Sequence, residues 1–310
     1  MKKPIAGLSL LAVLGLLLVL ALAAPASAFV STGGADGSVQ CSASSAGSAG
    51  VACAGRQAAA AMVIAKRILG HPPRGLAKTV VRRGKVRIAN DLNYPPQSFV
   101  DPRSHRLVGF DVDVAKKLAR ILHLKVVWKH PAWARVIPGL RAGRFDVSIG
   151  SMTITPERKK LVSFTRPYFF TGAQVFVKAG GTQITGPDDL AYKTVGVGEG
   201  TTYSDYLAQN TEAIVRTYSA DLDAIPDLLN GTIDFWMTDP LTGQKAILEG
   251  QALEFSGKPL YYEDVAMALK QREADWRKLL NYAVKKMHKH GSLTHMSKKW
   301  HSGLDLTVKQ

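Results

Sequence analysis

The chain has 310 residues, enough for two domains that each bury a hydrophobic core, and 46% of the residues are hydrophobic. Its 40 Lys and Arg against 24 Asp and Glu give a formal net charge of +16. The basic residues are scattered and form only short clusters, such as 285–286 and 298–299. This distribution favours a solvated basic surface and argues against a nucleic-acid partner.

The first 28 residues have the pattern of a secretory signal peptide. Lys2 and Lys3 precede an apolar run over residues 5–24, and the small residues Ala26-Ser27-Ala28 follow. The pattern predicts cleavage before Phe29 and a periplasmic or extracytoplasmic protein. The alternative is an uncleaved anchor, because about 20 apolar residues are long enough to span a bilayer.

Residues 29–79 are expected to form a flexible leader that ends in a short helix. The Ser-, Gly- and Ala-rich stretch over residues 31–55 has too little apolar surface to order itself. It holds the two cysteines of the chain, Cys41 and Cys53, which an exported protein can oxidise to a small local loop. Whether they pair is left open. An Ala-rich helix is expected over residues 56–69.

From about Val80 onward, short β-branched runs alternate with stretches of helical periodicity, which is typical of an α/β sheet with crossover helices. The first strands are predicted at 86–89, 126–129, 147–149 and 174–177, with helices at 110–122 and 133–142. After Gly180-Gly181 the pattern begins again. Strands are predicted at 194–197, 214–218, 235–238 and 263–269, with helices at 202–209, 222–230, 240–248, 276–290 and 293–300.

Polar residues follow the predicted strands at their carboxyl ends, which is where open α/β sheets bind ligands. They are Asp91, Tyr94, Gly150, Ser151, Thr153, Gly200, Thr201, Thr202 and Asp239, with Arg158 a few residues further on. The set comes from both halves of the predicted fold. We therefore expect a binding site between two lobes.

Five segments between about Lys85 and Trp300 carry a family resemblance. They span 90–96, 108–119, 137–169, 195–207 and 231–239. Together they resemble the bacterial extracellular solute-binding proteins of family 3, which are polar amino-acid-binding proteins of ABC transporters. The resemblance implies a polar amino acid, cationic or amide, held between two lobes and delivered to a membrane permease. It implies no catalysis, no cofactor, no metal and a monomer.

The same resemblance implies a two-lobed α/β fold of the type II periplasmic-binding-protein kind, with a hinge of two crossing segments. The first lobe is expected over residues 80–178 and 264–310, and the second over 179–263. We predict the crossing segments at residues 174–179 and 263–269. Ligand contacts from both lobes would then stabilise the closed state.

The chemistry of a zwitterionic ligand assigns a role to several of these residues. Arg158 supplies a planar fork for the carboxylate, and Thr202 adds donors from a helix N-terminus. Asp239 is expected to bind the ammonium. The carbonyl of Gly150 and the hydroxyls of Ser151 and Thr153 complete its shell. Taken singly, Arg158 has the context of a charged turn, while Asp239 and Thr202 have that of helix caps.

Three further residues are candidates for the ligand's side chain. Tyr94 and Trp133 would enclose it between aromatic rings, and the alternative for Trp133 is packing in the core. Asp91 would receive a cationic or amide group, and its alternative role is an Asx-turn within its own loop.

Two other classes of function remain open from the sequence. One is an exported dehydratase of the cyclohexadienyl or prephenate type, for which Glu199 is the only acid beside the Gly-rich loop. A general acid needs a proton-transfer partner, and the sequence shows none for Glu199. The other is a ligand-sensing partner of a chemoreceptor or sensor kinase.

Overall fold

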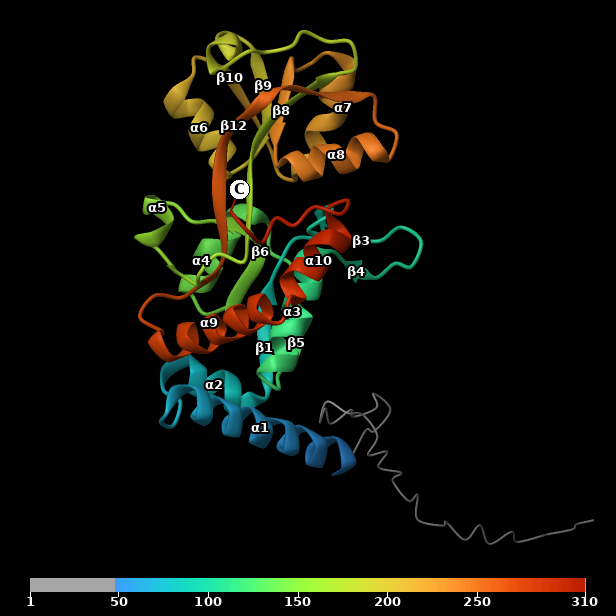
Figure 1. Ribbon diagram of the computed structural model, residues 1–310. Helices are drawn as coiled ribbons and strands as arrows, with labels where there is room; N and C mark the ends of the chain where they lie inside the picture. Colours follow the sequence, from blue (N-terminus) through green and yellow to red (C-terminus); the bar gives the residue numbers. More distant parts are fainter. Residues whose placement is uncertain (1–47, 310) are drawn as a thin grey trace, which may run out of the picture. The chain divides into compact units, whose positions relative to one another are not determined.

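The computed structural model describes residues 48–309, with side chains from residue 55 onward (Figure 1). The predicted signal peptide and Cys41 lie outside the described residues. Within them, no helix combines the length and the apolar composition that a membrane span requires.

The first lobe is built on three parallel strands. Strand β1 (Lys85–Ala89) pairs with both β5 (Lys125–Lys129) and β6 (Val147–Thr153). Buried residues of β1 and β6, such as Ile88 and Ile149, pack with the helices into one core. The helices of this lobe are α3 (Phe110–Ile121), α4 (Val136–Arg141), α5 (Pro156–Lys159), α9 (Ala274–Lys289) and α10 (Ser292–Trp300). The shorter strands are β2 (Asn93–Tyr94), β3 (Ser98–Val100), β4 (Leu107–Val108) and β7 (Ser163–Phe164).

The second lobe repeats the arrangement with its own core. Strand β9 (Thr194–Gly198) pairs in parallel with β10 (Ile214–Tyr218) and with β11 (Phe235–Thr238). Its helices are α6 (Thr202–Asn210), α7 (Ala224–Asn230) and α8 (Pro240–Leu248). Buried Val195, Leu207 and Met237 belong to a cluster separate from that of the first lobe. The predicted two-lobed α/β fold is confirmed.

Two long antiparallel strands, β8 (Phe169–Lys178) and β12 (Leu253–Leu269), run from one lobe to the other (Figure 1). On β8, Phe169 packs in the first core and Ala173 in the second, so the chain crosses between them. On β12 the crossing lies between Tyr261 and Val265. The predicted segment 174–179 was placed a few residues too late. Residues 174–176 already pair with β11 and belong to the second lobe's sheet.

The N-terminal part of the described chain is more ordered than expected. Helix α1 (Ser48–Leu69) begins eight residues before the predicted start at residue 56, and α2 (Gly75–Arg83) follows. Ala61, Ala65 and Leu69 form a stripe at four-residue spacing, which lets α1 pack closely on the core. Both helices contact α9. The folded part therefore starts ahead of Val80.

Candidate functional site

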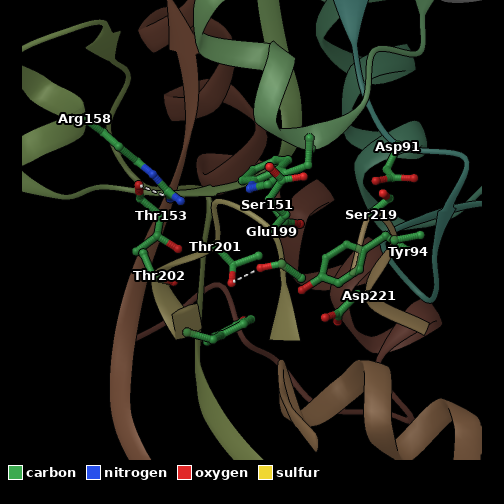
Figure 2. Close-up of a pocket in the computed structure, with 15 residues that line it drawn as sticks. Asp91, Tyr94, Ser151, Thr153, Arg158, Glu199, Thr201, Thr202, Ser219 and Asp221 are labelled. Atoms are coloured by element: carbon green, nitrogen blue, oxygen red, sulfur yellow. Dashed lines mark hydrogen bonds between the residues drawn. The ribbon is translucent and has the colours of Figure 1, made fainter. Parts of the chain in front are cut away.

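A cleft lies where strands of both lobes end. The first lobe lines it with Asp91, Tyr94, Trp133, Gly150, Ser151, Thr153 and Arg158. The second lobe lines it with Gly198, Glu199, Thr201, Thr202, Tyr203, Ser219, Ala220 and Asp221. Figure 2 shows Arg158 and Thr153 at one side of the cleft and Asp91, Ser219 and Asp221 at the other. Nine of the eleven residues predicted for the site line this cleft, and the two that do not are Gly200 and Asp239.

Arg158 is buried, yet its guanidinium has donors to spare. Its Nη1 donates to the carbonyl of Thr153 at 3.1 Å, and its Nη2 donates to the carbonyl of Gly200 in the other lobe at 3.2 Å. None of the ion pairs among residues 55–309 includes Arg158. A guanidinium carries five N–H donors, so most of them remain for an anion in the cleft. Burial lowers the pKa of Arg158, and nearby Glu263 opposes that effect.

Arg158 is held in place by its own short helix and by Trp133. The hydroxyl of Thr155 accepts the amide of Arg158 at 3.1 Å and caps helix α5. The Trp133 ring lies 5.7 Å from the guanidinium carbon, and its Nε1 donates to the carbonyl of Gly200 at 3.1 Å. Trp133 also packs against a buried cluster of the first lobe. Trp133 therefore fills both roles that the sequence left open, since it packs in the first lobe and lines the cleft. Gly200 connects the lobes, because its carbonyl accepts hydrogen bonds from Trp133 and Arg158.

The N-terminus of α6 presents two threonines to the cleft. The hydroxyl of Thr201 accepts the amide of Ser204 at 3.2 Å, which makes Thr201 the helix cap. The hydroxyl of Thr202 donates to the carboxylate of Glu263 on β12.

Glu263 is a functional candidate that the sequence did not reveal. It is 4% exposed and lies on a strand that crosses between the lobes. Burial raises its pKa, and the hydroxyls of Thr202 and Thr153 counteract the shift. The sequence pattern predicted the strand that contains Glu263, but it did not predict that the carboxylate contacts Thr202.

Asp239 does not reach the cleft surface. It is 1% exposed, accepts the amide of Leu241 at 2.7 Å as the cap of α8, and accepts a hydrogen bond from the hydroxyl of Thr171. Burial raises its pKa to about 6. Pro240 begins a helix here and the carboxylate turns back to cap it. The contact between Asp239 and a ligand ammonium stays a prediction.

Asp91 forms the Asx-turn that was its alternative role and still lines the cleft. Its Oδ1 accepts the amide of Asn93 at 2.8 Å. Tyr94 lies three residues further on, at the end of β2. Burial raises the pKa of Tyr94, and the nearby carboxylates of Asp239 and Asp221 raise it further.

Ser151 is positioned by a buried acid that the sequence did not single out. Its hydroxyl donates to Asp111 at 2.8 Å, and the hydroxyl of Tyr168 donates to the same carboxylate at 2.6 Å. Burial raises the pKa of Asp111 to about 7. Asp111 appeared in the sequence only as one residue of a helix.

Asp221 is a third acid that the sequence did not reveal. It follows β10 in a 3-10 turn (Asp221–Asp223) and lines the cleft. The rule that selected Asp91 and Thr201, a polar residue just after a strand, would also have selected Asp221. Among residues 55–309, no group of three or more His, Cys, Asp or Glu side chains is placed to hold a metal ion.

Residues 86–303 match the family described as bacterial extracellular solute-binding proteins, family 3. The chain belongs to this family. It is 36% identical over 262 residues to the L-cystine-binding protein TcyJ of Escherichia coli (strain K12), covering 82% of this chain and 97% of that protein.

Two solved structures have the same fold. An arginine-binding protein from T. maritima, in the form of a P235GK mutant, superimposes with a TM-score of 0.70 at 30% identity, covering 74% of this chain and all of that one. The ancestral amino acid-binding protein AncCDT-1, a precursor of cyclohexadienyl dehydratase, gives a TM-score of 0.68 at 30% identity over 72% and 98% of the two chains.

Proposed function

We propose that this protein is the extracytoplasmic substrate-binding component of an ABC transporter and that it binds a polar amino acid between its lobes. The observation that carries the proposal is the distribution of charge in the cleft. Arg158 lies at one side with free donors, and Asp91 and Asp221 lie at the other (Figure 2). A zwitterion presents the complementary pair of charges, and each charge needs a partner once the cleft excludes water.

In this proposal, Arg158 and the N-terminus of α6 hold the ligand carboxylate, while Ser151 and Thr153 supply hydroxyls beside it. Tyr94 and Trp133 flank the ligand's side chain. Because these groups come from both lobes, a bound ligand stabilises the closed arrangement. We keep the predicted lobes, residues 80–178 with 264–310 and residues 179–263, except that the boundary on β8 moves toward the N-terminus, to between Phe169 and Ala173.

The predicted signal peptide, residues 1–28, would export the chain, and a membrane permease would accept the ligand from it. The similarity to binding proteins such as TcyJ supports this role. We propose that the protein acts as a monomer.

A dehydratase activity is the competing proposal, since one structural neighbour is a precursor of such an enzyme. Glu199 lines the cleft but is exposed. Its carboxylate has no hydrogen-bond partner within the part of the chain that the structure describes. General acid catalysis needs such a partner to tune and relay the proton, so binding without catalysis is the better-supported function.

A thermal-shift screen tests the proposal directly. Ligands that bind only the folded protein raise the melting temperature, because they add about 2.7 kcal/mol of stabilisation at a concentration of 100 Kd. We expect at least one polar amino acid to do so, and neither its deaminated acid nor its amide to match it. Stabilisation by prephenate-like acids alone, with release of the dehydrated product, would instead establish the enzyme.

A further inference from the structure

Asp221 is a buried acid placed at the cleft, and one of its two carboxylate oxygens has no hydrogen-bond partner in the described chain. It is 9% exposed and follows β10 directly, beside Ser219 and Ala220 of the same loop. Its Oδ2 accepts a hydrogen bond from the hydroxyl of Thr238. Its Oδ1 is buried and has no hydrogen-bond partner among residues 55–309.

Two protein groups lie near that oxygen without completing a hydrogen bond to it, although the backbone N–H of Gly198 is near enough to lower the pKa of Asp221. Gly198 packs against it so closely that a Cβ there would lie 3.3 Å from Oδ1. The indole N–H of Trp236 is near enough to lower the pKa of Asp221, but this N–H is itself without a hydrogen-bond partner in the described chain. A buried carboxylate oxygen without a hydrogen-bond partner destabilises the folded protein. A donor from a ligand would remove the deficit.

The charges that line the cleft point to the kind of donor. Asp91, Glu199 and Asp221 are acidic, and Arg158 is the one basic residue of the lining. This local excess of negative charge contrasts with the net charge of +16 for the whole chain. An amino acid with a neutral side chain brings one charge of each sign and leaves the excess uncorrected. A ligand with a second positive nitrogen reduces it.

We propose that Asp221 binds the second cationic nitrogen of a ligand whose carboxylate is held by Arg158, and so selects amino acids with two positively charged nitrogens. The inference rests on the proposed function. Figure 2 shows Asp221 and Arg158 on opposite sides of the cleft, which requires a ligand that spans it. Arginine and the diamino acids, such as ornithine and lysine, have this chemistry. Burial raises the pKa of Asp221 to about 7, and a cation would favour its charged form.

Matched ligand pairs and an isosteric substitution test this selection by isothermal titration calorimetry on the purified protein. The pairs are arginine with citrulline and ornithine with norvaline. Each neutral member keeps the α-amino acid group and loses the distal cation. We expect the wild type to prefer the charged member of at least one pair by about tenfold or more, as a hydrogen bond between charged groups provides.

Asp221→Asn keeps the shape of the side chain and the acceptor for Thr238. Its affinity for the charged member of a pair should fall by about tenfold or more, while its affinity for the neutral member should change by less than about twofold. Asp223→Asn is the matched control, because Asp223 belongs to the same turn but is exposed and outside the cleft lining. It should leave both affinities unchanged. Melting curves of the unliganded variants establish that they are folded.

Four results would overturn the assignment. A wild type without preference for the charged members shows that no distal cation is selected. If Asp221→Asn loses the same affinity for both members of a pair, Asp221 binds the α-amino group. If both affinities are unchanged, Asp221 has a structural role only. In both cases the protein still binds amino acids, so the proposed function stands. If no amino acid of any class binds the wild type, the proposed function fails and this inference fails with it.

Discussion

Arg158 bridges the two lobes through backbone carbonyls alone, those of Thr153 and Gly200. A buried guanidinium with neutral partners is only partly compensated for the loss of hydration, so an anion in the cleft gains a strong, charge-assisted contact. The ligand carboxylate would complete this arrangement. The residue that appears in the sequence as part of a charged turn is thus the principal anchor in our proposal.

Arg158→Ala should weaken ligand binding by about 2 to 5 kcal/mol, because truncating one partner of a buried charge pair leaves the other unpaired. Arg158→Lys should restore little of the loss, since an ammonium has no planar fork. Calorimetric titration with the best ligand from the screen measures both variants.

Arg166→Ala is the control, as Arg166 is exposed and lies outside the cleft lining. An Arg158→Ala protein that stays folded and binds within tenfold of the wild type would rule out Arg158 as the anchor.

At the scale of the elements, the two crossing strands pass each other closely between the lobes. Gly172 on β8 pairs with Tyr262 on β12, and a Cβ at Gly172 would lie 2.6 Å from the carbonyl oxygen of Tyr261. That atom is backbone, so no side-chain rotation relieves the contact. Only glycine allows this approach where the chain crosses between cores.

Gly172→Ala should lower the free energy of unfolding by about 1 to 3 kcal/mol, because a methyl group forced against backbone shifts the paired strands. Urea denaturation measures the change. Gly186→Ala is the matched control, since a Cβ at Gly186 meets no atom within 4 Å. Equal unfolding midpoints for the two variants would contradict this prediction, because they would show that the crossing strands accommodate the methyl group without loss of stability.

At the scale of the whole molecule, buried carboxylic acids couple folding to pH. Burial raises the pKa of Asp111 and of Asp221 to about 7, above the ordinary value of 3.8. The folded protein therefore holds protons that the unfolded chain releases. The stability this provides is fully present below the ordinary pKa and is lost as the pH rises through the folded-state pKa. His301, whose pKa burial lowers to about 4, acts in the opposite direction, but only below about pH 6.5.

We expect the unliganded protein to melt at a lower temperature at pH 8 than at pH 6. Asp111→Asn should reduce this difference, because the amide cannot ionise in its fully buried position between Tyr168 and Ser151. Differential scanning calorimetry measures the shift, and Asp223→Asn, at an exposed position, should retain the wild-type dependence. A melting temperature that rises from pH 6 to pH 8 would contradict the coupling.

Much of the fold and of the site was predictable, because it depends on local patterns. Alternation of β-branched and helical stretches predicted strands such as β1 and β9, and the strand-end rule found Arg158's neighbours Ser151 and Thr153. The start of α1 was not predictable in this way. Its first residues are small, and they are helical as the extension of a stripe, Ala61 to Leu69, that packs on the core.

The sequence by itself indicated the family, through the resemblance of five segments. It also predicted the two lobes and the edge of each sheet at which a ligand is expected, because these follow from periodicity and from the direction of parallel strands. Only the tertiary structure decided which acids face the cleft. Asp239 and Asp221 both follow strands of the second lobe, yet the first caps α8 and the second lines the cleft. Glu263 reaches Thr202 through the pairing of β8 with β12. Such choices depend on contacts between residues far apart in the chain, which no local pattern encodes.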